Sequence, residues 1–186
     1  MKNLKITGLA LLIGIAPALA LAHPQAGGAH THGFFDGFVH PFSGLDHLLA
    51  MLAVGMWSAR QSNGKALPLA FLAAMLLGIL SGVAGLTIPG LETGIALSVA
   101  VMGCLVAVAA RLPASAGAAM VAAFAVLHGN AHGHELPEAA SAFGLLLASA
   151  LLILAARTVA RASPALMVKL AGAAIAAAGV LLVATA

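Results

Sequence analysis

The chain has 186 residues, of which 62% are hydrophobic and only 7% charged, and its formal net charge is +3. A soluble domain usually carries about a quarter charged residues, so this composition excludes a soluble globular protein. Disorder needs high charge and low hydrophobicity, and nucleic-acid binding needs a dense basic patch, so both are excluded as well. The composition predicts an all-α membrane helix bundle with several spans, in which eight histidines require an explanation.

Residues 1–22 have the plan of a secretory signal peptide. Lys2 and Lys5 precede a short apolar stretch, and small residues then offer cleavage after Ala20 or Ala22. A positive end, a short apolar middle and a small-residue end are typical of a cleaved signal. An uncleaved first transmembrane helix is the alternative. Cleavage would place the new amino terminus outside the cytoplasmic membrane.

Residues 23–38 follow as a predicted outer tail that is rich in histidine and glycine. His23, His30 and His32 lie in it. Short histidine-rich tracts are typical of metal binding, so the tail is predicted to meet metal ions outside the membrane. A solvated linker with incidental histidines is the alternative.

Residues 39–186 are predicted to form one domain of transmembrane helices. Crossing about 30 Å of hydrocarbon requires roughly 20 mostly apolar residues. Small residues four apart, such as Gly129 and Gly133, favour close contact between helices in lipid. Six spans are predicted, at residues 39–59, 66–86, 91–110, 114–133, 137–156 and 164–184.

The remaining charges predict the orientation of this bundle. With the mature amino terminus outside, the first, third and fifth connections face the cytoplasm. Those connections and the helix turns beside them hold all six remaining cations: Arg60, Lys65, Arg111, Arg157, Arg161 and Lys169. Four acidic residues fall on the opposite side: Asp36, Glu92, Glu135 and Glu138. Because excess Lys and Arg marks cytoplasmic loops, the charges agree with the orientation that the signal peptide predicts.

Two polar motifs interrupt the apolar chain, at the outer ends of the first and fourth predicted spans. They read His-Pro-Phe-Ser-Gly-Leu-Asp-His over residues 40–47 and His-Gly-Asn-Ala-His-Gly-His-Glu over residues 128–135. At about 100° per residue, His40 and His47 share one helix face about 10 Å apart. By the same arithmetic His128, His132 and Glu135 lie within a sector of about 60°. Ionisable residues inside spans usually mark ion or substrate pathways, so both motifs are predicted to be functional.

The two spans run antiparallel, so the depths of their polar residues can be compared. A single buried histidine is more often a packing residue, but six coordinating groups at matching depths favour a metal site. An outer and an inner layer of ligands are predicted: His40, His132 and Glu135 outside, and Asp46, His47 and His128 inside. Imidazole and carboxylate together suit nickel, cobalt, zinc or copper. His134 points away from this face and is predicted to be a loop or entrance residue, as a further candidate ligand outside the two layers.

At these motifs the chain resembles the HupE/UreJ family, small membrane proteins found with bacterial hydrogenase and urease systems. The first motif also looks like the His-x-x-x-x-Asp-His signature of a separate class of nickel and cobalt permeases, with one residue more before the Asp. The second motif departs from the family at Leu127, which precedes His128 where an aromatic residue is expected. The resemblance rests on His40-Pro41, Gly44, Asp46-His47, Leu49-Ala50-Met51, Ala53-Val54-Gly55, Trp57, His128-Gly129, Ala131-His132-Gly133 and Glu135.

The resemblance implies a permease of the bacterial inner membrane, not an enzyme, with its mature amino terminus in the periplasm. Nickel, with cobalt as the second choice, would enter the cytoplasm as substrate for metalloenzyme assembly. It implies no permanently bound cofactor. It also implies that the six residues of the two predicted layers are the metal ligands: His40, Asp46, His47, His128, His132 and Glu135. The expected partners are a divalent metal ion and the lipid bilayer, without nucleic acid, and a homo-oligomer is left open.

Two alternative functions and one question of architecture stay open at this stage. His128 and His132 have the i, i+4 spacing of a zinc pair, so an intramembrane zinc hydrolase, with Ser43 and Asp46 activating water, is one rival. A membrane metal sensor or metallochaperone is another. The histidine motif at the start of each half also suggests a 3+3 inverted repeat, a plan that recurs in transporters. Coincidental similarity of the two motifs is the alternative.

Overall fold

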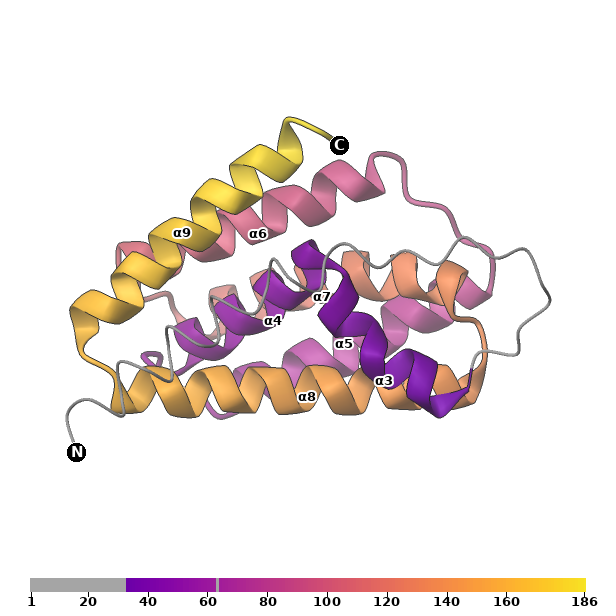
Figure 1. Ribbon diagram of the computed structural model, residues 1–186, viewed down its shortest axis with the longest axis horizontal. Helices are drawn as coiled ribbons and strands as arrows, with labels where there is room; N and C mark the ends of the chain where they lie inside the picture. The colour runs from indigo at the N-terminus through magenta and orange to yellow at the C-terminus, as the bar shows by residue number, and fades with distance from the viewer. Residues whose placement is uncertain (1–32, 63) are drawn as a thin grey trace.

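The computed structural model describes residues 33–62 and 64–186 (Figure 1). The predicted signal peptide, His23, His30 and His32 lie outside these residues. All regular structure in the described part is helical, which confirms the all-α prediction. Its seven helices are α3 (Phe34–Ser43), α4 (Leu45–Ser58), α5 (Ala66–Val83), α6 (Leu91–Ala107), α7 (Ala114–Glu135), α8 (Ala139–Ala162) and α9 (Ala165–Val183).

The described helices provide four or five candidate membrane spans. α5, α7, α8 and α9 are long and apolar enough to cross a membrane, and α3 with α4 would add a fifth if this bent pair is one span. α6 has 17 residues, fewer than the roughly 20 that a span requires. It ends at Ala107, and the chain then turns through Ala109, whose φ is 52°. The predicted count of six spans is therefore not confirmed, and neither is the inverted repeat.

The first predicted span is broken rather than straight. α3 and α4 form an angle of 83°, and the residue between them, Gly44, has extended backbone with φ −90° and ψ 115°. α3 also begins at Phe34, inside the segment predicted as tail. The expectation that His40 and His47 share one face of a continuous helix is therefore wrong, because the two histidines lie on different helices.

Local hydrogen bonds accommodate the break. Pro41 has no backbone N–H to lose, and the Ser43 hydroxyl donates to the carbonyl of His40 over 2.7 Å. Beyond the break, the Asp46 carboxylate accepts from the backbone N–H of His47, also over 2.7 Å. Polar side chains on both sides of Gly44 thus bond backbone groups near the helix ends that the break creates.

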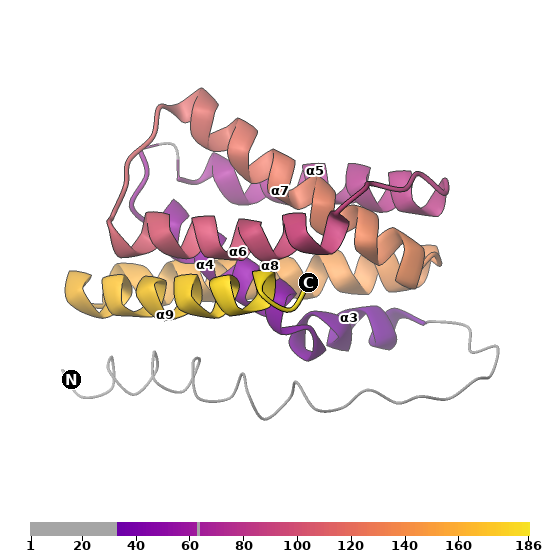
Figure 2. The same ribbon diagram turned by 90° about the horizontal axis from the view of Figure 1, so that it is seen from above.

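Helix pairs approach closely at glycines. α5 packs on α7, α6 on α9, and both α3 and α4 on α8, an arrangement seen from two directions in Figures 1 and 2. A Cβ atom added to Gly129 would lie 2.1 Å from the carbonyl oxygen of Met75, and one added to Gly78 would lie 2.4 Å from that of Val126. No side chain fits there, so the backbones of α5 and α7 touch, as small residues allow in lipid.

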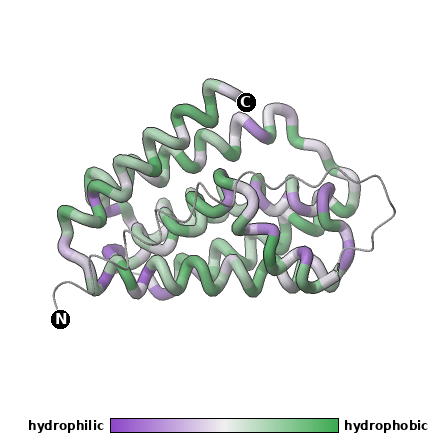
Figure 3. Tube along the Cα trace, in the orientation of Figure 1, coloured by the Kyte–Doolittle hydropathy of each residue, from purple (hydrophilic) through white to green (hydrophobic). Residues whose placement is uncertain are grey.

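α4 forms the centre of the bundle, since every residue from His47 to Ser58 is buried. Other helices pack around it, and α5, α6, α8 and α9 carry exposed leucines. Figure 3 shows mostly hydrophobic residues along the helices and hydrophilic ones towards their ends. A polar group on α4 therefore lies in an apolar interior, where it requires a hydrogen-bonding partner.

The connections divide the bundle into two ends. Those between α4 and α5, α6 and α7, and α8 and α9 lie at one end, and those between α5 and α6 and between α7 and α8 lie at the other (Figure 1). The six cations named above belong to the first end, which we call the cationic end. The two polar motifs belong to the second, which we call the histidine end.

Candidate metal site

The end of α7 supplies half of the predicted ligands. This helix continues to Glu135, two residues beyond its predicted end, so Glu135 is helical rather than part of a loop. His132 and Glu135 lie three residues apart, and such pairs face each other on a helix. The Nδ1 atom of His132 lies 3.1 Å from Oε2 of Glu135.

α3 brings His40 to the same place. Its Nε2 atom lies 3.1 Å from Oε2 of Glu135 and 3.1 Å from Nδ1 of His132. Ligand atoms of His40, His132 and Glu135 all lie within 4.8 Å of one another, so the three residues could hold one metal ion. The predicted outer layer is thus brought together, although by a helix that bends away from α4 rather than by a straight span.

His47 on α4 lies directly beneath this group. Its Nδ1 atom is 2.7 Å from Nε2 of His132, and its ring centroid is 5.6 Å from that of His128. His47 and His128 are each only 1% exposed. Because His132 touches both His40 and His47, the predicted outer and inner layers form one continuous group. We call His40, His47, His128, His132 and Glu135 the histidine cluster.

His128 has a free ligand atom. Its Nδ1 atom lies 2.9 Å from the carbonyl oxygen of Phe124, and since a carbonyl only accepts, Nδ1 carries the proton. Nε2 then bears a lone pair, and it is buried without a hydrogen-bond partner among the described residues. Buried polar atoms are rarely left in this state, and a histidine fixed through one nitrogen commonly binds metal through the other.

Ser149 on α8 belongs to the site but was not predicted from the sequence. Its fully buried hydroxyl lies 3.2 Å from Nε2 of His47. With neutral imidazoles, a single direction of donation satisfies the whole chain of bonds, from Ser149 to His47, from His47 to His132 and from His132 to Glu135. The only signal in the sequence is a serine within an apolar span, where a hydroxyl has to find a partner.

Two further predicted residues lie beside the cluster without joining it. Asp46 is half-buried, and one of its oxygens accepts from the backbone of His47. His134 is exposed, and its Nε2 donates to the carbonyl of Leu86 over 3.1 Å. Both line the cavity described next, so either side chain would have to turn to reach an ion at the cluster.

A cavity of about 770 Å³ connects the cluster with the surface. It is lined by both polar motifs, by the start of α6 and by the last residues of the chain. Glu92 and Glu135 are exposed, whereas His47 and His128 are buried. The cavity therefore leads from carboxylates at the surface to imidazoles in the interior, and this ligand set suits a borderline divalent metal rather than calcium or magnesium.

Comparison with known proteins places this site in a family. The family model described as HupE / UreJ protein matches residues 9–182. The chain is also 44% identical over 147 residues to "Protein HupE" of Rhizobium leguminosarum bv. viciae, a match that covers 77% of this chain and 74% of that protein. No solved structure matches the chain. The family match contains the whole histidine cluster, since it extends on both sides of residues 40–135.

Proposed function

This chain belongs to the HupE/UreJ family, and from that membership and its histidine cluster we propose that it is a membrane permease for a divalent transition metal ion. Nickel is the first candidate and cobalt the second. The ion would move as substrate into the cytoplasm of a bacterium, for assembly of a hydrogenase or urease. In this proposal the histidine end faces the periplasm and the cationic end faces the cytoplasm, as the excess of Lys and Arg there supports.

One observation carries the proposal. Four imidazoles and one carboxylate, drawn from α3, α4 and α7, are in contact along a cavity that leads from the surface to the buried His47 and His128. Buried ionisable groups are costly in a membrane and mark ion pathways. The unpartnered Nε2 of His128 supports the same conclusion, because it is a ligand atom already oriented by the bond on the other side of its ring.

The geometry suggests an order of events. An ion attracted by Glu92 and Glu135 would exchange water for His40, His132 and Glu135. His132 contacts His40 on one side and His47 on the other, so turning of its ring would transfer the ion inward, where His128 offers its free lone pair. The cluster contains no thiolate, which favours release, since transit requires binding weak enough for the ion to leave.

Binding would also replace hydrogen bonds within the cluster. Both nitrogens of His47 are bonded, one to His132 and one to Ser149, so a metal ion must displace one of these partners. Imidazoles bind metal only as neutral ligands. We therefore expect metal binding to release the protons of any cluster histidine that is charged, and uptake to weaken in acid.

The experiment is accumulation of radioactive nickel in cells that express the chain. His47→Ala and His128→Ala should each lower uptake at least about tenfold, because loss of a metal ligand typically costs this much affinity or more. His134→Ala is the matched control, since its imidazole bonds a backbone carbonyl outside the cluster, and it should retain at least half of the uptake. Unchanged uptake in both cluster variants, at equal amounts in the membrane, would overturn the proposal. Competition by cobalt, zinc and copper would identify the preferred ion.

The uptake assay tests one rival function, and analysis of the purified chain tests the other. A metal sensor or metallochaperone would bind the ion without changing accumulation. A zinc hydrolase would retain one tightly held zinc after purification and would hydrolyse lipid or peptide. The geometry gives the hydrolase no specific support, because the Ser43 hydroxyl donates to a backbone carbonyl and an Asp46 oxygen accepts from a backbone N–H.

A further inference from the structure

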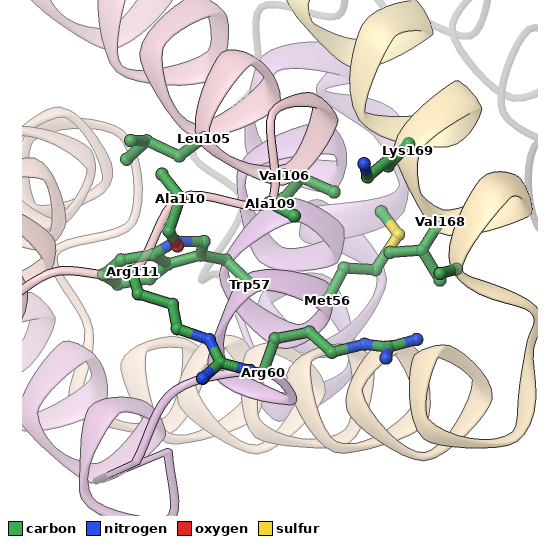
Figure 4. Close-up of a pocket in the computed structure, with 11 residues that line it drawn as sticks. Met56, Trp57, Arg60, Leu105, Val106, Ala109, Ala110, Arg111, Val168 and Lys169 are labelled. Carbon is green, nitrogen blue, oxygen red and sulfur yellow. The ribbon is translucent and has the colours of Figure 1, made fainter.

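A second pocket lies at the cationic end, remote from the histidine cluster. It has a volume of about 140 Å³ and lies between the ends of α4 and α6, the start of α9 and the connection from α6 to α7. Arg60, Arg111 and Lys169 line it together with the buried side chains of Met56 and Trp57. Figure 4 shows the guanidinium groups of Arg60 and Arg111 along one edge and the Lys169 ammonium at the opposite edge.

The three cations are not neutralised within the described part of the chain. None of them forms an ion pair with a carboxylate there, where every ion pair involves Glu135 at the other end of the bundle. Among the described residues Arg60 has two long hydrogen bonds, to the carbonyls of Ala160 and Ser163 over 3.4 and 3.5 Å. All three side chains belong to exposed residues, so they are free to meet an anion.

The connection that carries Arg111 is held in place. The carbonyl of Ala110 accepts from Nε1 of Trp57 over 3.0 Å and from Nε2 of Gln61 over 2.8 Å. Gln61 also accepts from the backbone of Leu112 over 3.3 Å. Ala109 has φ 52°, a left-handed conformation that is strained for a residue with a Cβ atom. Strain of this kind persists where surrounding bonds enforce it, and it gathers at ligand sites.

We propose that this pocket binds the phosphate headgroup of an anionic phospholipid. Arginine side chains suit phosphate because their planar donors match its oxygens, and basic pockets between transmembrane helices on the cytoplasmic side bind anionic headgroups. The apolar half of the ligand also has a surface to follow. Leu166 and Leu170 flank Lys169 on α9 and are 61% and 55% exposed. A free phosphate would contact the cations alone, whereas a lipid would contact the cations with its headgroup and Leu166 and Leu170 with its acyl chains.

The test measures lipid retained by the purified full-length chain. Protein in zwitterionic detergent is mixed with phosphatidylglycerol or with phosphatidylcholine, and bound lipid is counted by native mass spectrometry. Phosphatidylglycerol should bind in preference to phosphatidylcholine. In Arg60→Gln/Arg111→Gln/Lys169→Gln the affinity for phosphatidylglycerol should fall about 100-fold, since each juxtamembrane cation contributes roughly a fivefold factor.

One control variant and one further pocket variant make the result specific. Lys65→Gln/Arg161→Gln removes exposed cations of the same end that do not line the pocket, and it should retain wild-type binding. Val168→Trp keeps every cation but fills the buried apolar wall, and it should also lose the lipid. Equal binding by the triple variant and the wild type, or equal losses in the pocket and control variants, would overturn the proposal. If inorganic phosphate displaced phosphatidylglycerol at equal concentration, the proposal of a lipid ligand would be overturned, and the pocket would be a site for a free anion.

Discussion

The histidine cluster at one end of the bundle and the buried Arg157 at the other satisfy their polar groups in different ways. Within the cluster side chains bond one another, as His40 does with Glu135 and His47 with His132. Arg157 bonds mainly backbone carbonyls. The buried guanidinium of Arg157 donates to the hydroxyl and carbonyl of Ser58, over 2.9 and 2.8 Å, and to the carbonyl of Gly64.

This difference separates exchangeable contacts from fixed ones. Bonds among imidazoles and a carboxylate can be surrendered to an incoming cation, because each freed nitrogen or oxygen becomes a ligand. The bonds from Arg157 to the carbonyl oxygens of Ser58, at the end of α4, and of Gly64 are different, because no incoming ion replaces the guanidinium as donor. These bonds tie the start of α5 to the end of α4. We therefore expect substitutions at the histidine end to affect transport first and those at the cationic end to affect stability first.

The largest loss of stability is expected from Arg157→Leu. This change leaves the carbonyls of Ser58 and Gly64 buried without a charged donor, and hydrogen bonds to charged groups contribute about 1.5–3 kcal/mol each. The free energy of unfolding, measured by titrating SDS into mixed micelles, should fall by about 3 kcal/mol. Arg161→Leu, one turn further along α8 and exposed, is the matched control and should change it by less than about 0.5 kcal/mol. Equal losses of unfolding free energy in Arg157→Leu and Arg161→Leu would show that the buried bonds of Arg157 do not stabilise this end of the bundle.

His132→Ala should produce the reverse pattern. It removes the residue that joins the outer and inner parts of the cluster, so nickel uptake should fall at least about tenfold. After this change His40 and Glu135 still bond each other, and the freed groups line a cavity open to water, which can replace part of the lost bonds, so the same SDS titration should show a smaller loss than Arg157→Leu. A loss of stability that matches that of Arg157→Leu, with uptake retained, would show that His132 is structural.

Glu135→Gln should have the smallest effect. The exposed amide keeps the shape of the carboxylate, and its oxygen can still bind the metal ion and accept from His132 and His40, but it loses the negative charge that attracts a cation. We expect uptake to fall about threefold at low nickel concentration and to recover at high concentration, because a surface charge is worth about 1 kcal/mol or less. A loss that persists at saturating nickel would contradict this expectation and show that the ion requires the charged carboxylate as its ligand.

Much of the site on α7 could be predicted from the sequence. The helical period places His128, His132 and Glu135 on one side of a single helix, and that relation does not depend on neighbours. Gly129 and Gly133 of α7 could be recognised as points of close contact for the same reason. Prediction failed at the junction of α3 and α4 and for residues 34–38, which the sequence assigns to the tail, because the period cannot show that a chain stops being helical at Gly44, where the angle of 83° depends on packing of α3 against α8.

The sequence by itself determined the helical class, the apolar character of the bundle, the separation of cations from histidines and the ligand set of each motif. These properties follow from composition and from local periodicity. Only the tertiary structure decided that His40 meets His132, that Ser149 joins His47, and that Arg60, Arg111 and Lys169 share a pocket. Each of these contacts joins helices far apart in the sequence, and their relative positions depend on how closely small residues let the backbones approach.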